Sequence, residues 1–219
     1  MNARLFLLLV LILALPLIPF LLWDQELENA IVEWTKSCGS DPWIIAGGVT
    51  AALAVDLFLP IPSSVLSVFC ARHLSSIVTP SWLGLTLAVF SIWLGMTLGA
   101  LSAFLLGKLG GQALARKWVG EEEFARMQRI GNERGAMILV VLRAVPLFAE
   151  AAALALACSG VKFWKTFFVP VALSNLGIAL IYCILGSSDN GLPFWAVFLA
   201  SIAIPAVVSL FARLWLKSR

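Results

Sequence analysis

Charged side chains are scarce in this sequence. Asp, Glu, Lys and Arg make up only 12% of its 219 residues, whereas they make up about 25% of an ordinary soluble domain. Hydrophobic residues account for 61% of the chain, and the mean hydropathy is +0.99. These values exclude a typical soluble domain and predict a protein of the lipid bilayer. The length suits a single membrane domain over residues 1–219.

The motifs of several common functions are also missing. The net charge is only +3 and no basic run is interleaved with aromatic residues, so nucleic-acid binding is not expected. One histidine and four scattered cysteines give neither the spacing of metal ligands nor a disulfide framework. There is no His-Glu-x2-His, no Gly-x-Ser-x-Gly and no pair of carboxylates in a water-exposed segment. The sequence therefore predicts neither an enzyme nor a cofactor or metal site.

Long apolar runs are what the sequence has in abundance. Four of them are long enough to cross a bilayer, and they cover residues 5–23, 82–106, 166–186 and 194–216. Tryptophans lie at or near their ends, as expected for side chains at the level of the lipid headgroups. The first run is expected to remain as a span, because it is too long for the apolar part of a cleaved signal peptide.

Two further apolar stretches, residues 43–72 and 136–158, are broken by proline and charge. The loop at 24–42 carries five acids and one lysine, whereas the connector at 108–135 carries six bases and four acids. The positive-inside rule therefore places the connector in the cytoplasm. With this connector inside, residues 82–106 cross inward, and residues 5–23 cross outward from the basic N-terminus. The broken stretch between these two spans must therefore return to the outer side, from which it entered. By the same argument, the stretch at 136–158 returns to the cytoplasmic side. Each limb of the first stretch has about 14 residues, or about 21 Å of helix, against a hydrocarbon core of about 30 Å.

The predicted fold is thus an all-α integral membrane protein with about four transmembrane helices and two opposed re-entrant helical hairpins. A broken hairpin followed by an unbroken span occurs twice, from opposite faces, which is the inverted-repeat plan of many transporters. Twelve of the fifteen bases then lie on the inner side. Both termini of this multi-pass chain are predicted to be cytoplasmic.

The break in the first hairpin holds Asp56, Pro60 and Pro62. The two prolines remove two backbone donors and prevent a regular helix. Backbone that is not helical exists at membrane depth only where protein or a water-filled cavity surrounds it. The alternative is a loop at the membrane surface with a solvated Asp56.

The break in the second hairpin holds Arg143, Pro146 and Glu150. A charge near the centre of a spanning helix costs about 2.5 to 3.5 kcal/mol on insertion scales, so such groups rarely occur without a partner or a function. Arg143 offers bidentate donors to a phosphate, and an acid held away from water binds a proton more readily, which makes proton coupling a hypothesis. The alternative is an ion pair of Arg143 with Glu150 or Asp56 that only stabilises the fold.

The order of these elements resembles the DedA family and the wider VTT-domain group, also known as the SNARE-associated Golgi protein type. The likeness covers roughly residues 43–186 and consists of Asp-x3-Pro-x-Pro, a Gly-rich span, a basic connector, Arg-x2-Pro and a later glycine. By position, Asp56 matches the acid before Pro-x-Pro, and Gly160 matches the later glycine. Arg143 and Pro146 match the Arg-x2-Pro element.

Two positions depart from the pattern of many DedA members. Ser63 and Ser64 stand where those proteins have an acid, and Phe148 and Ala149 stand where they have a second arginine. Glu150 is closer to other VTT branches. The likeness is therefore to the broad group.

The resemblance implies a lipid translocase or scramblase of the plasma (inner) membrane. Its partners would be membrane lipids, either phospholipid or polyprenyl phosphate, and protons if transport is coupled to them. The alternatives are a non-transporting membrane scaffold or assembly factor, and a transporter of small solutes or ions. Homo-oligomerisation is left open. The residues predicted to contact the transported headgroup are Asp56, Pro60, Pro62, Arg143, Pro146, Glu150 and Gly160.

Two secondary patterns lie between the hairpins. Ser91, Gly95, Gly99, Ala103 and Gly107 recur every four residues, which favours close packing against another helix of the same chain over dimerisation. Residues 112–134 contain several bases. They are interpreted either as an amphipathic helix on the inner leaflet, attracted to anionic lipids by about 1 kcal/mol per base, or as a simple connector.

Overall fold

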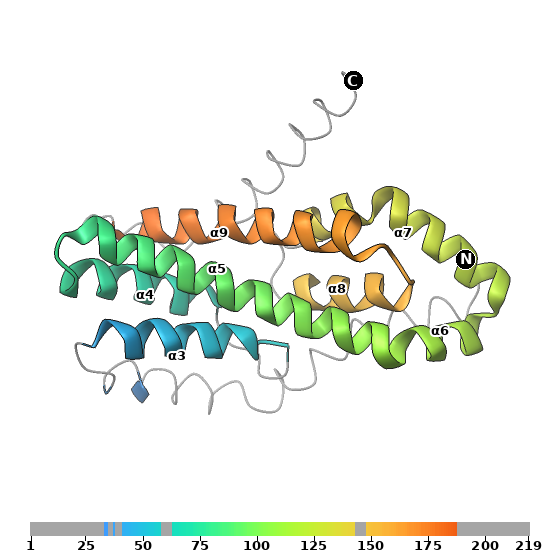
Figure 1. Ribbon diagram of the computed structural model, residues 1–219, viewed down its shortest axis with the longest axis horizontal. Coiled ribbons are helices and arrows are strands. Elements are labelled where there is room, and N and C mark those ends of the chain that lie inside the picture. Colours follow the sequence, from blue (N-terminus) through green and yellow to red (C-terminus); the bar gives the residue numbers. More distant parts are fainter. Residues whose placement is uncertain (1–32, 35–36, 38–40, 58–62, 143–147, 188–219) are drawn as a thin grey trace, which may run out of the picture. The chain divides into compact units, whose positions relative to one another are not determined.

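A computed structural model of the chain describes residues 33–34, 37, 41–57, 63–142 and 148–187 (Figure 1). These residues form helices and turns without any β-strand, so the predicted all-α class is confirmed for this part of the chain. Two helices within it, Ser81–Val119 and Phe163–Ser187, are long and apolar enough to cross a membrane. They coincide with the predicted spans at 82–106 and 166–186. The predicted spans at 5–23 and 194–216 lie outside the described residues.

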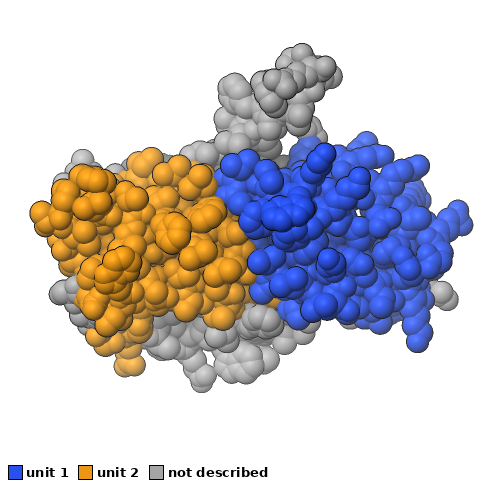
Figure 2. All heavy atoms as spheres, viewed as in Figure 1, with its two compact units in different colours: residues 1–18, 100–174, 205–219 blue, residues 19–99, 175–204 orange. Residues whose placement is uncertain are grey.

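The chain divides into two compact units (Figure 2). Unit 1 comprises residues 1–18, 100–174 and 205–219, and unit 2 comprises residues 19–99 and 175–204. The helices of unit 2 are α3 (Pro42–Ala54), α4 (Ser63–Ile77) and the first part of α5 (Ser81–Leu106), together with the second part of α9 (Val169–Ser187).

The first helix of the hairpin at 43–72 begins with a complete cap. A carboxylate oxygen of Asp41 accepts hydrogen bonds from the backbone N–H of Trp43 (2.8 Å) and of Ile44 (3.4 Å). Pro42 occupies the first turn, where a proline costs no hydrogen bond. The helix ends at Ala54, and α4 begins at Ser63 and packs against α3. The predicted helix, break and second helix are therefore present, although Pro60 and Pro62 lie outside the described residues.

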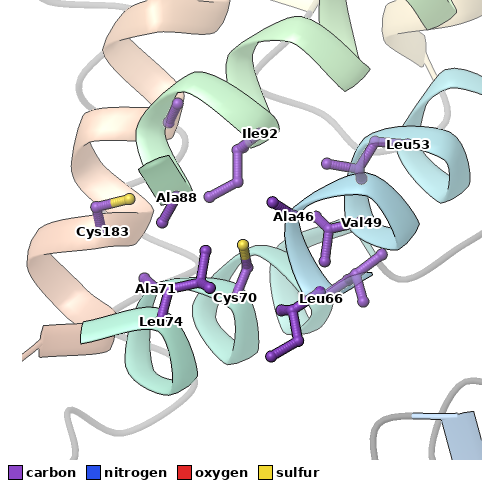
Figure 3. Packing of buried hydrophobic residues seen from close by; sticks show 12 residues of the cluster. Ala46, Val49, Leu53, Leu66, Cys70, Ala71, Leu74, Ala88, Ile92 and Cys183 are labelled. Carbon is purple, nitrogen blue, oxygen red and sulfur yellow. The ribbon is translucent and has the colours of Figure 1, made fainter. Parts of the chain in front are cut away.

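Leucine and isoleucine side chains, together with small alanine and cysteine side chains, fill the centre of unit 2 (Figure 3). The buried cluster draws on α3, α4, α5 and α9, and its members point toward one another. Lipid tails are as apolar as these side chains, so close van der Waals packing, which small residues permit, holds such helices together within a bilayer. The labelled members are Ala46, Val49, Leu53, Leu66, Cys70, Ala71, Leu74, Ala88, Ile92 and Cys183.

The ridge of small residues on α5 packs against other helices of the same chain. A Cβ atom on Gly99 would lie 2.7 Å from the carbonyl oxygen of Leu53 in α3, and one on Gly95 would lie 2.8 Å from that of Thr50. In unit 1, a Cβ atom on Gly107 would lie 2.6 Å from the Cβ atom of Ala157. The predicted internal role of the ridge is confirmed.

Unit 1 contains the helices that follow α5. These are the π-helical segment η1 (Gly107–Gly111), α6 (Gln112–Val119), α7 (Glu121–Leu142), α8 (Phe148–Cys158), the π-helical segment η2 (Phe163–Phe168) and the start of α9. The helix from Ser81 to Val119 has 39 residues and a length of about 58 Å, almost twice the hydrocarbon core. Its last part, α6, therefore extends beyond the apolar segment.

The predicted single amphipathic helix at 112–134 is wrong, because the chain turns at Gly120. Gly120 has a φ of 88°, a conformation that suits glycine and ends α6. The next helix, α7, then runs from Glu121 to Leu142 without interruption. The last part of the connector at 108–135 and the first limb of the hairpin at 136–158 thus share one helix, since no proline lies between Gly120 and Pro146. The membrane boundaries of these segments stay predictions.

A pair of glycine variants tests the packing of α3 on α5. We expect Gly99→Ala to lower the free energy of unfolding by about 1–3 kcal/mol, because the added methyl group meets backbone that must shift. Gly177→Ala on α9 is the control, since among the described residues no atom outside its own helix backbone lies within 4 Å of its added Cβ, and we expect it to be neutral or stabilising by up to about 1 kcal/mol. Equal melting temperatures for the two variants in detergent would contradict the close contact.

Candidate functional site

The acid of the first break lies at the far end of an apolar helix. Asp56 is half-buried in the turn that follows α3, beside the buried Leu57. α3 has 13 residues, none of them charged, and is about 20 Å long. Its other end is the exposed cap residue Asp41. Asp56 is therefore separated from a water-exposed helix start by a length of about two thirds of a hydrocarbon core.

The acid of the second break lies in the first turn of α8. Glu150 is the third residue of that helix, which ends eight residues later at Cys158, or about 12 Å further along the axis. Arg143 and Pro146 lie outside the described residues, between the end of α7 at Leu142 and the start of α8 at Phe148.

Gly160 ends α8. Its φ is 72°, and its N–H donates to the carbonyl oxygen of Ala157 at 3.0 Å. A Cβ atom there would lie 2.9 Å from Nε2 of Gln128 and 3.3 Å from the ring of Phe124. The backbone conformation thus favours glycine without any bound substrate, and a side chain there would displace the end of Gln128. Contact of Gly160 with a transported headgroup stays a prediction.

Three amide side chains, which we call the amide cluster, hold the end of α8. Nε2 of Gln112 donates to the carbonyl oxygen of Ala157 at 2.9 Å, and Nε2 of Gln128 donates to that of Gly160 at 2.8 Å. Oδ1 of Asn132 accepts from the backbone N–H of Lys162 at 2.9 Å. These bonds satisfy backbone groups that a helix end leaves unpaired. Gln128 and Asn132 lie one turn apart on α7. This spacing was visible in the sequence, but the amide cluster was not predicted from it.

A second polar contact, also missed, joins two spans within unit 2. Asn175 is fully buried in α9 and donates through Nδ2 to Oγ1 of Thr97 in α5 at 3.1 Å. Oγ1 of Thr97 in turn donates to the carbonyl oxygen of Trp93 at 2.6 Å. The sequence did indicate such a contact, because Asn175 lies within an apolar span and a buried polar group in a membrane needs a partner.

The structure leaves the convergence of the two breaks as a prediction. Asp56 belongs to unit 2, whereas Glu150 and Gly160 belong to unit 1. Within each unit, the helix residues near the break are apolar or small: α3 contains Ala51, Ala52 and Leu53, and α8 contains a run of seven alanines and leucines after Glu150.

Removal of one amide tests the amide cluster. We expect Asn132→Ala to destabilise the protein by about 1–3 kcal/mol, because the Lys162 N–H loses its acceptor. Hydrogen exchange at the Lys162 amide should speed up, which mass spectrometry of the purified protein measures. Glu133→Ala, an exposed neighbour on α7, is the control and should leave that exchange unchanged. Unaltered exchange in Asn132→Ala would show that the bond contributes nothing.

A double-mutant cycle tests the contact between the spans. The variants are Asn175→Ala, Thr97→Ala and their combination. Hydrogen bonds between membrane helices contribute about 0.6 kcal/mol on average and up to about 1.7 kcal/mol, so we expect a coupling energy in that range from unfolding in detergent. Strictly additive effects would mean that the two side chains do not stabilise each other.

Comparison with known proteins identifies the family of the chain. A family model described as the VTT domain matches residues 59–188, more than half of the 219 residues. The match begins after Asp56 and covers the second break together with Gly160. Searches of the curated proteins and of the solved structures gave no match. The extent of the family match, together with the two apolar spanning helices, shows that this chain is a membrane protein of the VTT-domain family, the group that includes DedA.

Proposed function

We propose that this protein moves lipid headgroups across the bilayer as a translocase or scramblase. The observation that carries the proposal is that two helix pairs, α3 with α4 and α7 with α8, are each broken within an apolar stretch that bears an acid. Asp56 follows α3, and Glu150 lies in the first turn of α8. A polar headgroup needs polar partners inside the hydrocarbon, because lipid tails offer none.

The lengths of the helices support re-entrant hairpins. α3, α4 and α8 have 13, 15 and 11 residues, or about 20, 22 and 16 Å, all short of a core of about 30 Å. In each pair the two helices contact each other. α7 is longer, but its charges end at Arg134, so only about its last eight residues suit hydrocarbon. Four spans and two hairpins that enter from opposite faces complete this proposed topology.

The proposed route joins the two breaks. Pro60, Pro62 and Pro146 keep the backbone there from forming a regular helix, which leaves carbonyl and amide groups for contacts along the route. Arg143 binds the phosphate of the headgroup with two parallel hydrogen bonds. Glu150 and Asp56 take up and release a proton during the cycle, if transport is coupled to protons.

Location and orientation follow from the same proposal. The protein lies in the plasma (inner) membrane with both termini in the cytoplasm. The exposed bases of η1, α6 and α7 face the cytoplasm, as the positive-inside rule requires. Phospholipid and polyprenyl phosphate are the candidate cargoes, and both present a phosphate to Arg143.

Two other functions stay in view. A membrane scaffold or assembly factor is favoured by the amide cluster and by Gly160, whose contacts are fully explained by folding. A transporter of small solutes or ions needs the same breaks with a smaller cargo. One assay distinguishes both of these functions from lipid movement.

That assay places the purified protein in liposomes with a fluorescent phospholipid and follows exchange between leaflets. We expect the protein to accelerate exchange, and Asp56→Asn and Glu150→Gln to slow it by about tenfold or more, because each removes a charge from the proposed route. Glu133→Gln on the exposed face of α7 is the matched control. Exchange no faster than in empty liposomes supports the scaffold, and solute flux without lipid exchange supports the solute transporter.

Two further variants refine the assay. Arg143→Lys keeps the charge and loses the planar fork, so full activity would exclude bidentate phosphate contact. If Asp56→Asn and Glu150→Gln both match the parent in rate and in pH dependence, proton coupling is wrong.

A further inference from the structure

An exposed apolar surface continues past the end of the apolar run at 82–106. Leu105 and Leu106, which close that run, are both exposed, and the same helix then exposes Leu109 (82%) and Leu114 (55%). We call these four residues the leucine face. The whole helix carries three bases and no acid. The charge that ends the apolar run therefore does not end the exposed apolar surface.

The leucine face continues a surface that faces lipid. Phe90 and Leu98 are exposed on the spanning part of the same helix. An exposed side chain there meets lipid tails, because the chain is a membrane protein. Transfer of apolar surface from water to lipid is favourable. Contact with lipid therefore stabilises the leucine face, whereas contact with water does not.

Bases border the leucine face. Lys108 lies beside Leu109, and Arg116 and Lys117 follow in α6; all three bases are exposed. Lysine and arginine can lay their apolar stems along lipid while their charged ends stay among the headgroups. Arg116 is also paired with Glu121, with Nε 3.3 Å from Oε1. An exposed apolar face bordered by bases is typical of a helix at the membrane surface.

The neighbouring helix α7 lacks such a face in its first part. Its exposed residues between 121 and 134 are charged, except for Ala125 and Ile130. The sequence left open whether residues 112–134 bind the inner leaflet or only connect two segments. Within these residues, an exposed apolar surface suited to lipid belongs to α6, and the exposed surface of α7 suits water.

The segment that bears the leucine face also holds the end of α8. A Cβ atom on Gly107 would lie 2.7 Å from the carbonyl oxygen of Leu154, and one on Gly111 would meet Sγ of Cys158. The earlier glycine thus meets an earlier part of α8, and the later glycine meets its last residue. The two helices therefore run in the same direction, as Figure 1 shows. The first turn of α8 lies toward the apolar run, away from α6.

We infer that the leucine face contacts lipid at the boundary between acyl chains and headgroups of one leaflet, and so holds the end of α8 at this level. Glu150 then lies up to about 12 Å deeper in the membrane, because it is eight residues before the end of α8. Half of a hydrocarbon core is about 15 Å. This depth suits the proposed route for headgroups, but the lipid contact of the leucine face does not rest on that function.

Spin labels in liposomes test the contact. Leu109→Cys and Leu114→Cys are each labelled with a nitroxide in the full-length protein. The accessibility of the label to oxygen, which concentrates in lipid tails, is compared with its accessibility to a nickel chelate, which stays in water. We expect the ratio of oxygen to nickel accessibility to be several times higher at both positions than in Ala125→Cys, the control on α7. The parent, treated in the same way, gives the background from native cysteines.

Each other outcome overturns the inference. A ratio equal to that of Ala125→Cys places the leucine face in water. A label that neither oxygen nor the nickel chelate reaches is covered by protein, either another segment of this chain or a second copy. If Leu114→Cys does not fold, Ala113→Cys, which is also exposed, replaces it with the same expected ratio.

The outcomes for the two proposals are distinct. A leucine face in lipid, together with no accelerated lipid exchange by the parent, overturns lipid translocation and leaves the contact. A leucine face in water or under protein overturns the contact, whatever the rate of lipid exchange.

Discussion

Backbone groups that leave a helix inside hydrocarbon must find partners within the protein, because lipid tails supply neither donors nor acceptors. Much of the described structure meets this constraint. At the end of α3, the N–H of Val55 bonds back to the carbonyl oxygens of Ala51 and Ala52. At the end of α8, Gln112 and Gln128 reach carbonyl groups from other helices. A chain that breaks its helices twice needs such partners at each end that does not face water.

The same constraint explains the placement of glycine. Gly99 lets α5 approach the last carbonyl groups of α3, and Gly107 lets it approach those of α8. On α7, Gly131 and Gly135 face Val161 and Leu156, so that Gln128 and Asn132 beside them reach the turn after α8. Without a hydrophobic effect between helices in lipid, close contact and a few hydrogen bonds supply the cohesion. Small residues therefore allow the close approach of helices, and the amide side chains form hydrogen bonds where the helices approach.

The sequence predicted those features that depend on local chemistry. Hydropathy located the spans at 82–106 and 166–186, and the prolines at 60 and 62 located the break after α3, because both effects act within a few residues. The continuity of α7 across residue 135 was not predicted, since hydropathy changes there while nothing interrupts the helix. The partners of Gln128 and Asn132 lie 32 and 30 residues away along the chain, and no local pattern encodes such a pairing. The sign of φ at Gly160 was likewise invisible in the sequence, and the predicted contact of this glycine with a headgroup stays a prediction.

The position of Glu150 links stability to the proposed transport. Glu150 is the third residue of α8, and the helix ends about 12 Å further along its axis. Any substitution inside a helix also changes the stability of that helix. A loss of transport on removing Glu150 is therefore evidence of a route only if the hydrogen exchange of α8 is unchanged in the same variant.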